Sequence, residues 1–110
     1  MKHKTAELEG DALDYMVRCA ESGKAPLMSV AEWTCSNIYG YNPSRNWDQA
    51  GPIIEGEEMR SSHYETEMYP GEPWHYWTPS NCTGHGFTPL IAAMRAYVAS
   101  KLGPEVELPD

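Results

Sequence analysis

The spacing of apolar residues along the chain predicts a helix over residues 11–22. In this segment Leu13, Met16, Val17 and Ala20 recur at intervals of three and four positions, which places them on one face of a helix. Gly23 follows directly and is suited to end the helix, because glycine adopts the left-handed conformation of a C-cap without strain. The pattern indicates an amphipathic helix with one face on the core.

A second helical pattern, over residues 89–102, is the clearest in the chain. Thr88 is a residue type that favours the N-cap, and Pro89 stands at the first helical position, where its missing N–H costs nothing. Gly103 follows the last apolar position and is suited to stop the helix. We expect the helix to pack against a sheet through its apolar residues: Leu90, Ile91, Met94, Tyr97, Val98 and Leu102.

Two neighbouring segments predict an antiparallel hairpin. Residues 74–78 alternate clearly, with Trp74, Tyr76 and Thr78 on one face. Residues 63–69 alternate less regularly, and Pro70-Gly71 between the two segments is a turn signal. We therefore expect these two segments to pair within one small sheet.

Three further segments complete the predicted fold. Residues 52–55 are typical of a short strand, and residues 26–33 are compatible with a strand or a turn of helix. Residues 39–52 combine turn formers with aromatic residues, which is typical of an ordered loop with packed rings. The whole pattern predicts an α+β fold: a small antiparallel sheet of three to four strands packed against two helices, 11–22 and 89–102. We expect one domain over residues 1–104 and a flexible acidic tail over residues 105–110.

Length and charge narrow the classes of function. A chain of 110 residues has room for one hydrophobic core. Its formal charge is −8, and its eight Lys and Arg residues are scattered along the chain. A protein that binds duplex nucleic acid needs clustered cations to displace counterions from the backbone, so we exclude that class. A small anionic ligand held by one or two arginines remains compatible with this charge.

Cysteine usage and hydropathy indicate an intracellular protein. The three cysteines are an odd number without a C-x-x-C motif, which favours a reducing compartment. The start of the chain lacks the apolar stretch of a signal peptide, and no apolar run reaches the length of a membrane span. We therefore predict a cytoplasmic protein that makes no membrane contact.

Candidate chemistry for an enzyme or a metal site is weak. Cys82-x-x-His85 has the spacing of half a metal site and lacks a second half, so we predict neither a metal nor a cofactor. Neither Cys35 nor Cys82 stands in a motif that supplies a base and an oxyanion hole, and the alternative is a packed or surface thiol. We assign no catalytic residue and expect the protein not to be an enzyme.

Two segments resemble the phage NinX-like family. They are residues 41–55, YNPSRNWDQAGPIIE, and residues 88–103, TPLIAAMRAYVASKLG. Residues 4–14 are also similar to the start of that family, whereas residues 57–83 depart from its pattern. The resemblance implies a small accessory protein of phages and prophages, which would act in the cytoplasm of the bacterial host cell, and it implies no particular activity.

The candidate binding site combines the aromatic and polar loop with the start of the last helix. A helix N-terminus offers free N–H groups and a partial positive charge to an anion. The alternative is that Trp47 packs in the core, that the polar residues cap turns, and that Gly84 and Gly86 serve only a turn. Our candidate ligand-binding residues are Ser44, Arg45, Asn46, Trp47, His85, Thr88 and Arg95.

These residues favour a binding function over a catalytic one. Our first hypothesis is a non-enzymatic binder, or sponge, of a small nucleotide-like signalling molecule used in host defence. One base stacked on a ring contributes about 1–3 kcal/mol and one charge-assisted hydrogen bond about 1.5–3 kcal/mol, whereas micromolar affinity needs about 8 kcal/mol. A single shallow patch does not reach that sum, so we expect a homo-oligomer with a shared pocket.

The alternative hypothesis is a protein-interaction module that binds a host or phage protein. Aromatic residues are enriched among the hot spots of protein interfaces, and the second strand of the predicted hairpin carries three of them. The candidate interaction surface is Trp74, Tyr76 and Trp77.

Overall fold

The computed structural model describes residues 2–109 and shows an α+β fold. Within these residues the helices are α1 (Gly10–Ser22), α2 (Val30–Ser36), α3 (Trp47–Gly56) and α4 (Pro89–Leu102), with a 3-10 turn, η1 (Thr5–Glu7). The strands are β1 (Lys2–Lys4), β2 (Arg60–His63), β3 (Trp74–Trp77), β4 (Thr83–Gly86) and β5 (Glu105–Glu107). They form a three-stranded sheet of order β2–β3–β4 and a separate β1–β5 pair. No helix among residues 2–109 is long and apolar enough to cross a lipid bilayer.

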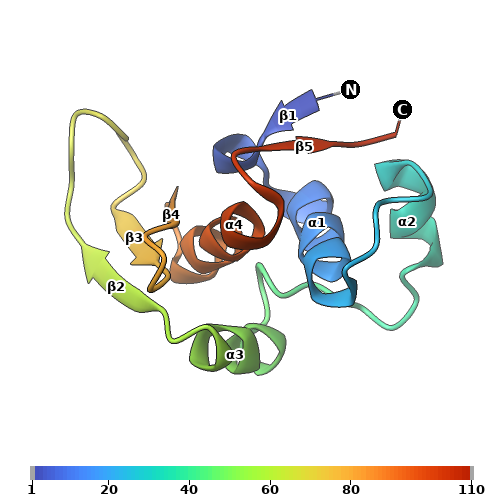
Figure 1. Cartoon of the computed structure of the whole chain (residues 1–110), viewed down its shortest axis with the longest axis horizontal. Helices are drawn as coiled ribbons and strands as arrows, with labels where there is room; N and C mark the ends of the chain where they lie inside the picture. Colours follow the sequence, from blue (N-terminus) through green and yellow to red (C-terminus); the bar gives the residue numbers. More distant parts are fainter. Residues whose placement is uncertain (1, 110) are drawn as a thin grey trace.

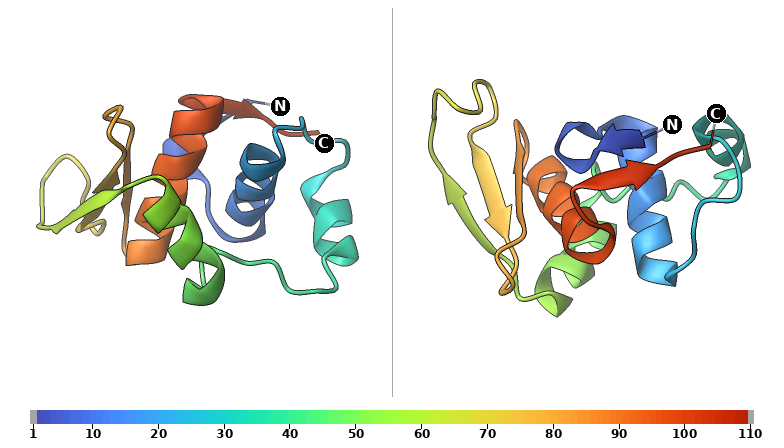
Figure 2. Two further views of the ribbon diagram at one scale, coloured as in Figure 1. Left: turned by 60° about the horizontal axis from the view of Figure 1, so that its bottom comes forward. Right: turned by 45° about the horizontal axis from the view of Figure 1, so that its top comes forward.

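Helix α4 is the centre of the molecule. The three-stranded sheet lies on one side of it and α1 on the other, with α2 beyond α1 (Figures 1 and 2). Residues 90–98 are all buried. A helix that is apolar all round is a buried helix, so α4 packs on two sides and not only on the sheet. The bounds Pro89–Leu102 confirm the predicted helix, and Thr88 caps it as expected, because its Oγ1 accepts from the N–H of Ile91 at 3.2 Å.

Two glycines bring β4 unusually close to α4. A Cβ placed on Gly84 would lie 2.1 Å from the carbonyl oxygen of Ala92 and 2.4 Å from the nitrogen of Ala96. A Cβ on Gly86 would lie 2.8 Å from the nitrogen of Ala92. Any larger residue at either position would push the strand away from the helix. The glycines therefore serve this contact, and the segment expected to be a loop leading into the helix is strand β4.

The predicted hairpin exists with a shifted first strand. β3 pairs antiparallel with residues 60–63, so that Arg60 stands opposite Trp77, and residues 64–73 form the connection. The predicted alternation of β3 is confirmed: Tyr76 stands opposite Gly84, and both face α4. The first strand was misplaced because the rings of residues 64 and 69 stack on the sheet's outer face and do not enter a ladder.

Residues 47–56 form helix α3, which corrects the strand predicted over residues 52–55. Asn46 caps the helix, because its Oδ1 accepts from the N–H of Asp48 at 2.9 Å. The buried Ala50 and Ile53 are three positions apart, which is a helical spacing, and α3 contacts α4. A short apolar run with β-branched residues cannot be assigned to strand or helix from its pattern alone, and this was the source of the error.

The segment over residues 26–33, left open between strand and helix, leads into helix α2. A capping box starts this helix: Ser29 Oγ accepts from the N–H of Glu32, and the Glu32 carboxylate accepts from the N–H of Ser29. Trp33 stacks on Tyr15 of α1 with ring centroids 5.1 Å apart. The Tyr15 hydroxyl also donates to the carbonyl oxygen of Met28 at 2.8 Å. These contacts attach α2 to α1.

The segment expected as a flexible tail from residue 105 contains an ordered strand. β5 pairs antiparallel with β1, with Lys2 opposite Glu107 and Lys4 opposite Glu105 (Figure 1). Val106 and Leu108 are buried. The alternation of acidic and apolar residues over 105–108 allows one face to join the core, and the Lys residues of β1 stand opposite the acidic ones. Asp110 lies outside the described residues.

Candidate functional site

A groove runs between the turn before α3 and the start of α4. Its volume is about 570 Å³, and the residues that line it include Glu9, Ser44, Arg45, Trp47, Phe87 and Leu90. The two segments are about forty residues apart in the sequence, and both contain candidate site residues. The structure thus brings together Ser44, Arg45, Trp47 and Thr88, four of the seven candidate ligand-binding residues.

Two large rings are exposed at this groove. The side chain of Trp47, the first residue of α3, is 56% exposed, and that of Phe87 is 60% exposed. Phe87 occupies the position before the Thr88 cap, where an apolar residue usually packs on the fourth residue of the helix, here Ala92. Ala92 is instead covered by β4, because Gly84 and Gly86 approach it closely. Phe87 is therefore left at the surface, and Trp47 is not part of the core.

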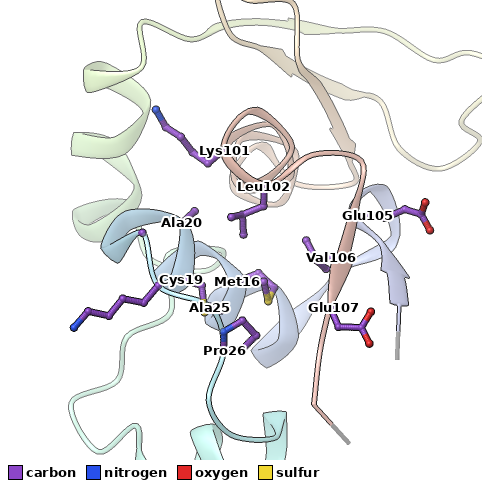
Figure 3. Close-up of a pocket in the computed structure, with 12 residues that line it drawn as sticks. Met16, Cys19, Ala20, Ala25, Pro26, Lys101, Leu102, Glu105, Val106 and Glu107 are labelled. Carbon is purple, nitrogen blue, oxygen red and sulfur yellow. The ribbon is translucent and has the colours of Figure 1, made fainter.

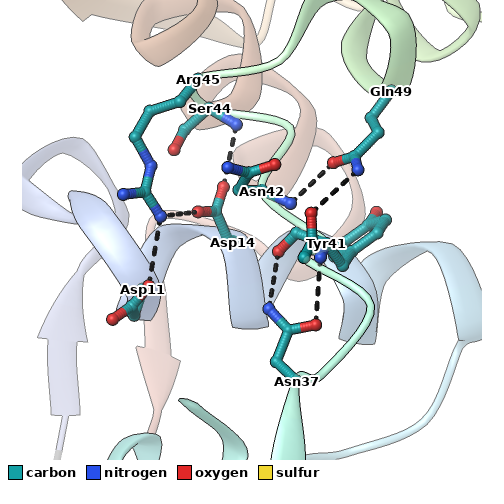
Figure 4. Close-up of polar contacts among 9 residues, drawn as sticks. Asp11, Asp14, Asn37, Tyr41, Asn42, Ser44, Arg45 and Gln49 are labelled. Atoms are coloured by element: carbon teal, nitrogen blue, oxygen red, sulfur yellow. Dashed lines mark hydrogen bonds and ion pairs between the residues drawn. The ribbon is translucent and has the colours of Figure 1, made fainter.

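The polar wall of the groove is built around a buried carboxylate. Asp14 of α1 is fully buried and accepts from the N–H of Ser44 at 2.8 Å and from Arg45 Nη2 at 3.3 Å (Figure 4). Arg45 Nη2 also lies 3.2 Å from Asp11 Oδ1. Burial raises the pKa of Asp14, while the Ser44 N–H and the Arg45 guanidinium lower it. Much of the positive charge of Arg45 is therefore neutralised by the carboxylates of Asp11 and Asp14.

The loop that carries this wall is held by side-chain amides. The Gln49 amide accepts from the N–H of Asn42 at 2.6 Å and donates to the carbonyl oxygen of Gly40 at 3.0 Å. Asn37 in the same way accepts from the N–H of Tyr41 at 3.0 Å and donates to its carbonyl oxygen at 2.9 Å (Figure 4). These paired bonds satisfy the loop backbone and hold the groove wall in place before any ligand binds. The side-chain oxygen of Asn46 caps α3.

The start of α4 offers few donors to an anion. Pro89 has no N–H, the N–H of Ile91 donates to Thr88 Oγ1, and the N–H of Ala92 donates to the Thr88 carbonyl oxygen at 3.2 Å. Thr88 thus uses its polar atoms to complete the helix. The phosphate-binding role expected for this helix N-terminus has little backbone support.

Arg95 lies inside the protein and does not reach the groove. Its Nε donates to the carbonyl oxygen of Leu8 at 2.7 Å, and its Nη1 donates to the carbonyl oxygen of His85 at 2.7 Å. The same nitrogen forms an ion pair with Glu72. With 5% of its surface exposed, Arg95 joins the N-terminal segment, β4 and the 64–73 loop. It is a structural residue and is not available to a ligand in this structure.

His85 belongs to a histidine pair on the outer face of the sheet. Its Nδ1 lies 2.6 Å from His75 Nδ1, and His75 Nε2 lies 3.1 Å from the carbonyl oxygen of Tyr64. A carbonyl only accepts, so His75 Nε2 carries the proton, His75 Nδ1 accepts, and His85 Nδ1 donates. The ring of Tyr69 stacks on His85 at 3.7 Å, and the ring of Tyr64 stacks on His75 at 4.0 Å.

The surroundings of His85 disfavour its charged form. Burial lowers the pKa of His85, His75 and Arg95 lower it further, and Glu72 acts in the opposite direction. His85 is therefore neutral at pH 7, in agreement with its role as a donor to His75. Among residues 2–109, no group of three or more His, Cys, Asp or Glu side chains is placed to hold a metal ion.

The three aromatic residues of β3 do not form one interaction surface. Trp74 and Tyr76 face α4, where Tyr76 is buried and Trp74 packs against the core. Trp77 lies on the opposite face, at the far end of the strand. The three side chains of the predicted surface therefore lie on opposite faces of the strand and cannot contact one partner together. Phe87, whose ring is exposed at the groove, is not among the candidate residues predicted from the sequence.

A second recess lies beside the C-terminal end of α1. Its volume is about 520 Å³, and Figure 3 shows Met16, Leu102 and Val106 directed toward it from three elements. Lys24, Lys101 and two glutamates stand at its rim. No aromatic side chain lines it, so it offers smaller anchoring contacts than the groove with Trp47 and Phe87.

Comparison with known proteins agrees with the resemblance of the two segments. None of the curated proteins matches the chain. The model of a family described as "Bacteriophage P22, NinX" matches residues 4–101, which include all the groove residues and every element from α1 to the last turn of α4. The match covers far more than half of the 110 residues. The chain therefore belongs to the NinX family of bacteriophage P22.

Proposed function

We propose that this phage protein is a non-enzymatic binding protein whose groove takes an apolar segment of a partner protein. The observation that supports this function is the exposure of Trp47 and Phe87 together on one groove of about 570 Å³. Large rings exposed side by side on a small protein mark interaction sites, and interface hot spots are enriched in such residues. The amide-bonded loop beside them provides a wall that does not need to be ordered on binding.

The charge around the groove favours a partner with basic flanks. Glu9 lines the groove, and Asp11 and Asp48 neighbour its lining residues. Arg45 is the one cation in the lining, and it is paired with two carboxylates. The chain as a whole carries −8. Such a surface attracts Lys and Arg and repels acidic segments, so we expect an apolar anchor flanked by basic residues.

The nucleotide-like ligand expected from the sequence has weaker support at this groove. Arg95 is enclosed by protein partners, Arg45 is shared between Asp11 and Asp14, and Pro89 has no N–H to donate. Two aromatic anchors of about 2–4 kcal/mol each supply about half or more of the roughly 8 kcal/mol that micromolar binding of a peptide needs, and the other apolar contacts of the peptide supply the rest. Nucleotide binding by the protein, and the homo-oligomer that we tied to it, remain predictions.

Selection from a random peptide library on the purified protein tests the function. We expect the selected peptides to carry an apolar anchor flanked by Lys or Arg, and their affinity to fall with added salt. Trp47→Ala and Phe87→Ala should each weaken binding by roughly 30-fold, measured by fluorescence anisotropy. Tyr39→Ala is the matched control, because its ring is 93% exposed and lies outside the groove lining.

Several results would contradict the proposal. One is selection of acidic peptides, or of peptides that bind the Trp47→Ala protein as tightly as the wild type. Another is displacement of the selected peptide from the groove by a cyclic dinucleotide at equal concentration, which would favour the nucleotide-like ligand. Tyr39→Ala weakening binding as much as Trp47→Ala would show that adhesion is nonspecific.

A further inference from the structure

A separate pocket lies at the end of the three-stranded sheet where β2 begins and β3 ends. Its volume is about 440 Å³, and it is lined by Glu58, Arg60, Trp77, Thr78, Pro79 and Asn81. It shares no residue with the groove at the start of α4. Its lining combines one cation, one large ring and several polar side chains, which is a different chemistry from that of the groove.

The cation and the ring of this pocket are direct neighbours in the sheet. Arg60 is the first residue of β2, Trp77 is the last residue of β3, and the two stand opposite each other in the antiparallel register. Residues directly opposite in such a pair place their side chains on the same face of the sheet. Arg60 and Trp77 therefore project from the same face of the sheet, and both line the pocket.

Arg60 differs from the other arginines in having no partner. The guanidinium of Arg18 lies over the Tyr41 ring at 5.2 Å, and Arg45 and Arg95 are held by carboxylates. Within residues 2–109, the Arg60 side chain has no hydrogen bond, ion pair or ring contact, although its backbone pairs with that of Trp77. Its positive charge is thus free to bind an anion, in a chain whose net charge is −8.

The backbone at both sides of the pocket is unusual. Glu58 has φ of 51° and Asn81 has φ of 67°, and these are the non-glycine residues with positive φ within residues 2–109. Asn tolerates this conformation, whereas Glu rarely adopts it. Glu58 adopts it where α3 ends, since the N–H groups of Glu58 and Met59 bond back to the carbonyl oxygens of Glu55 and Ile54, and Asn81 adopts it in the turn between β3 and β4. Here both residues line the same pocket.

We propose that this pocket binds a small planar molecule with one anionic group, of the nucleoside monophosphate type. The ring stacks on Trp77, and the phosphate pairs with Arg60, whose planar fork matches phosphate geometry. Asn81 and Glu58 contact the ring edge, and the Glu58 carboxylate favours rings that present an N–H donor. The nucleotide-like ligand class expected from the sequence is thereby assigned to a different site, away from Arg45 and Arg95.

Titration with AMP, followed by NMR, tests the site directly. We expect saturable shifts of the Trp77 indole N–H and the Arg60 side-chain signal. Adenosine lacks the phosphate and inorganic phosphate lacks the ring, so each should bind at least about tenfold more weakly than AMP. Arg60→Gln should weaken AMP binding by about tenfold or more, while Arg18→Gln serves as the matched control and leaves it unchanged.

The role of Glu58 has its own readout. AMP presents an amino group at the ring edge, whereas purine riboside 5′-monophosphate has no N–H donor there, so AMP should bind more tightly than this analogue. Glu58→Gln should abolish this preference, because an amide side chain both donates and accepts. Circular dichroism of each variant establishes that it is folded, and unchanged peptide binding at the groove separates this test from that of the proposed function.

Several outcomes would overturn the assignment. They are the absence of saturable shifts up to about 10 mM AMP, equal binding by wild type and Arg60→Gln, or shifts that centre on Arg45 and Trp47. Binding of inorganic phosphate as tight as that of AMP would exclude a ring-stacking site. Equal affinity of the wild type for AMP and for purine riboside 5′-monophosphate would remove Glu58 from the site.

Discussion

At the residue scale, the pair of His75 and His85 ties the 64–73 loop to the sheet. His85 Nδ1 donates to His75 Nδ1, His75 Nε2 donates to Tyr64, and Tyr69 covers the His85 ring. The loop helps to enclose the His85 ring, and this burial lowers the pKa of His85 and favours its neutral form. The order of the loop is therefore linked to the protonation state of one imidazole.

The stability of the protein should fall on mild acidification because of this histidine. The pKa of His85 is lower in the folded state than the value of about 6.5 in the unfolded chain, so the unfolded state takes up more protons. The stabilisation is complete above about pH 6.5 and is lost as the pH falls toward the folded pKa. His85→Asn keeps an N–H donor and takes up no proton. The free energy of unfolding of this variant, measured in urea, should change less between pH 7.5 and 5.5 than that of the wild type. If the two proteins lost stability equally over this range, the pH dependence would not come from His85.

The candidate site was predictable at the residue scale only where its members are close in sequence. Ser44, Arg45 and Trp47 lie within one short segment and were found from it. Arg95 was assigned to the wrong role because its partner Leu8 is 87 residues away, and nothing local reveals such a bond. Phe87 was missed because its exposure depends on the contact between β4 and α4.

At the scale of elements, the close contact of β4 with α4 gives a prediction with a matched control. Gly84→Ala places a methyl group 2.1 Å from the Ala92 carbonyl oxygen, so we expect a loss of about 1–3 kcal/mol or more. Gly51→Ala, in helix α3, meets no atom within 4 Å and should stabilise by about 0.4–1 kcal/mol. Chemical denaturation measures both. A Gly84→Ala protein as stable as the wild type would show that the strand and helix can separate without cost.

The elements with long, regular periodicity were predictable and the short ones were not. The helices over residues 11–22 and 89–102 carry repeated apolar spacing and end at glycines, so their bounds agree with the structure to within one residue. Helix α3 and strand β5 are too short for a helical spacing of apolar residues to be told from the alternation of a strand. Strand β5 also depends on β1, which is about one hundred residues earlier in the chain.

At the scale of the whole molecule, the order of layers explains why α4 shows no polar face. The three-stranded sheet, α4, α1 and α2 follow one another, so the central helix is covered on both sides (Figure 2). The groove forms where three segments meet around the first turn of this helix: the chain before α1, the turn before α3, and the residues after β4. The meeting of two of these segments, the turn before α3 and the start of α4, was predictable from the sequence. The third segment, at Glu9 and Gly10, was not predictable, because the apolar pattern of the sequence does not show where the chain before α1 lies relative to α3 and α4.

The pairing of β1 with β5 makes the backbone nearly a closed ring. Lys2 and Glu107 are direct partners, and such Cα atoms lie about 4.5–5.5 Å apart, so a short glycine linker can join the two ends. A circular permutant that starts at the exposed Tyr39, between α2 and α3, should fold cooperatively with a stability within about 1–2 kcal/mol of the parent. Thermal unfolding by circular dichroism would measure this. A permutant opened at His85 should be unfolded, because the cut interrupts the strand that lies against α4.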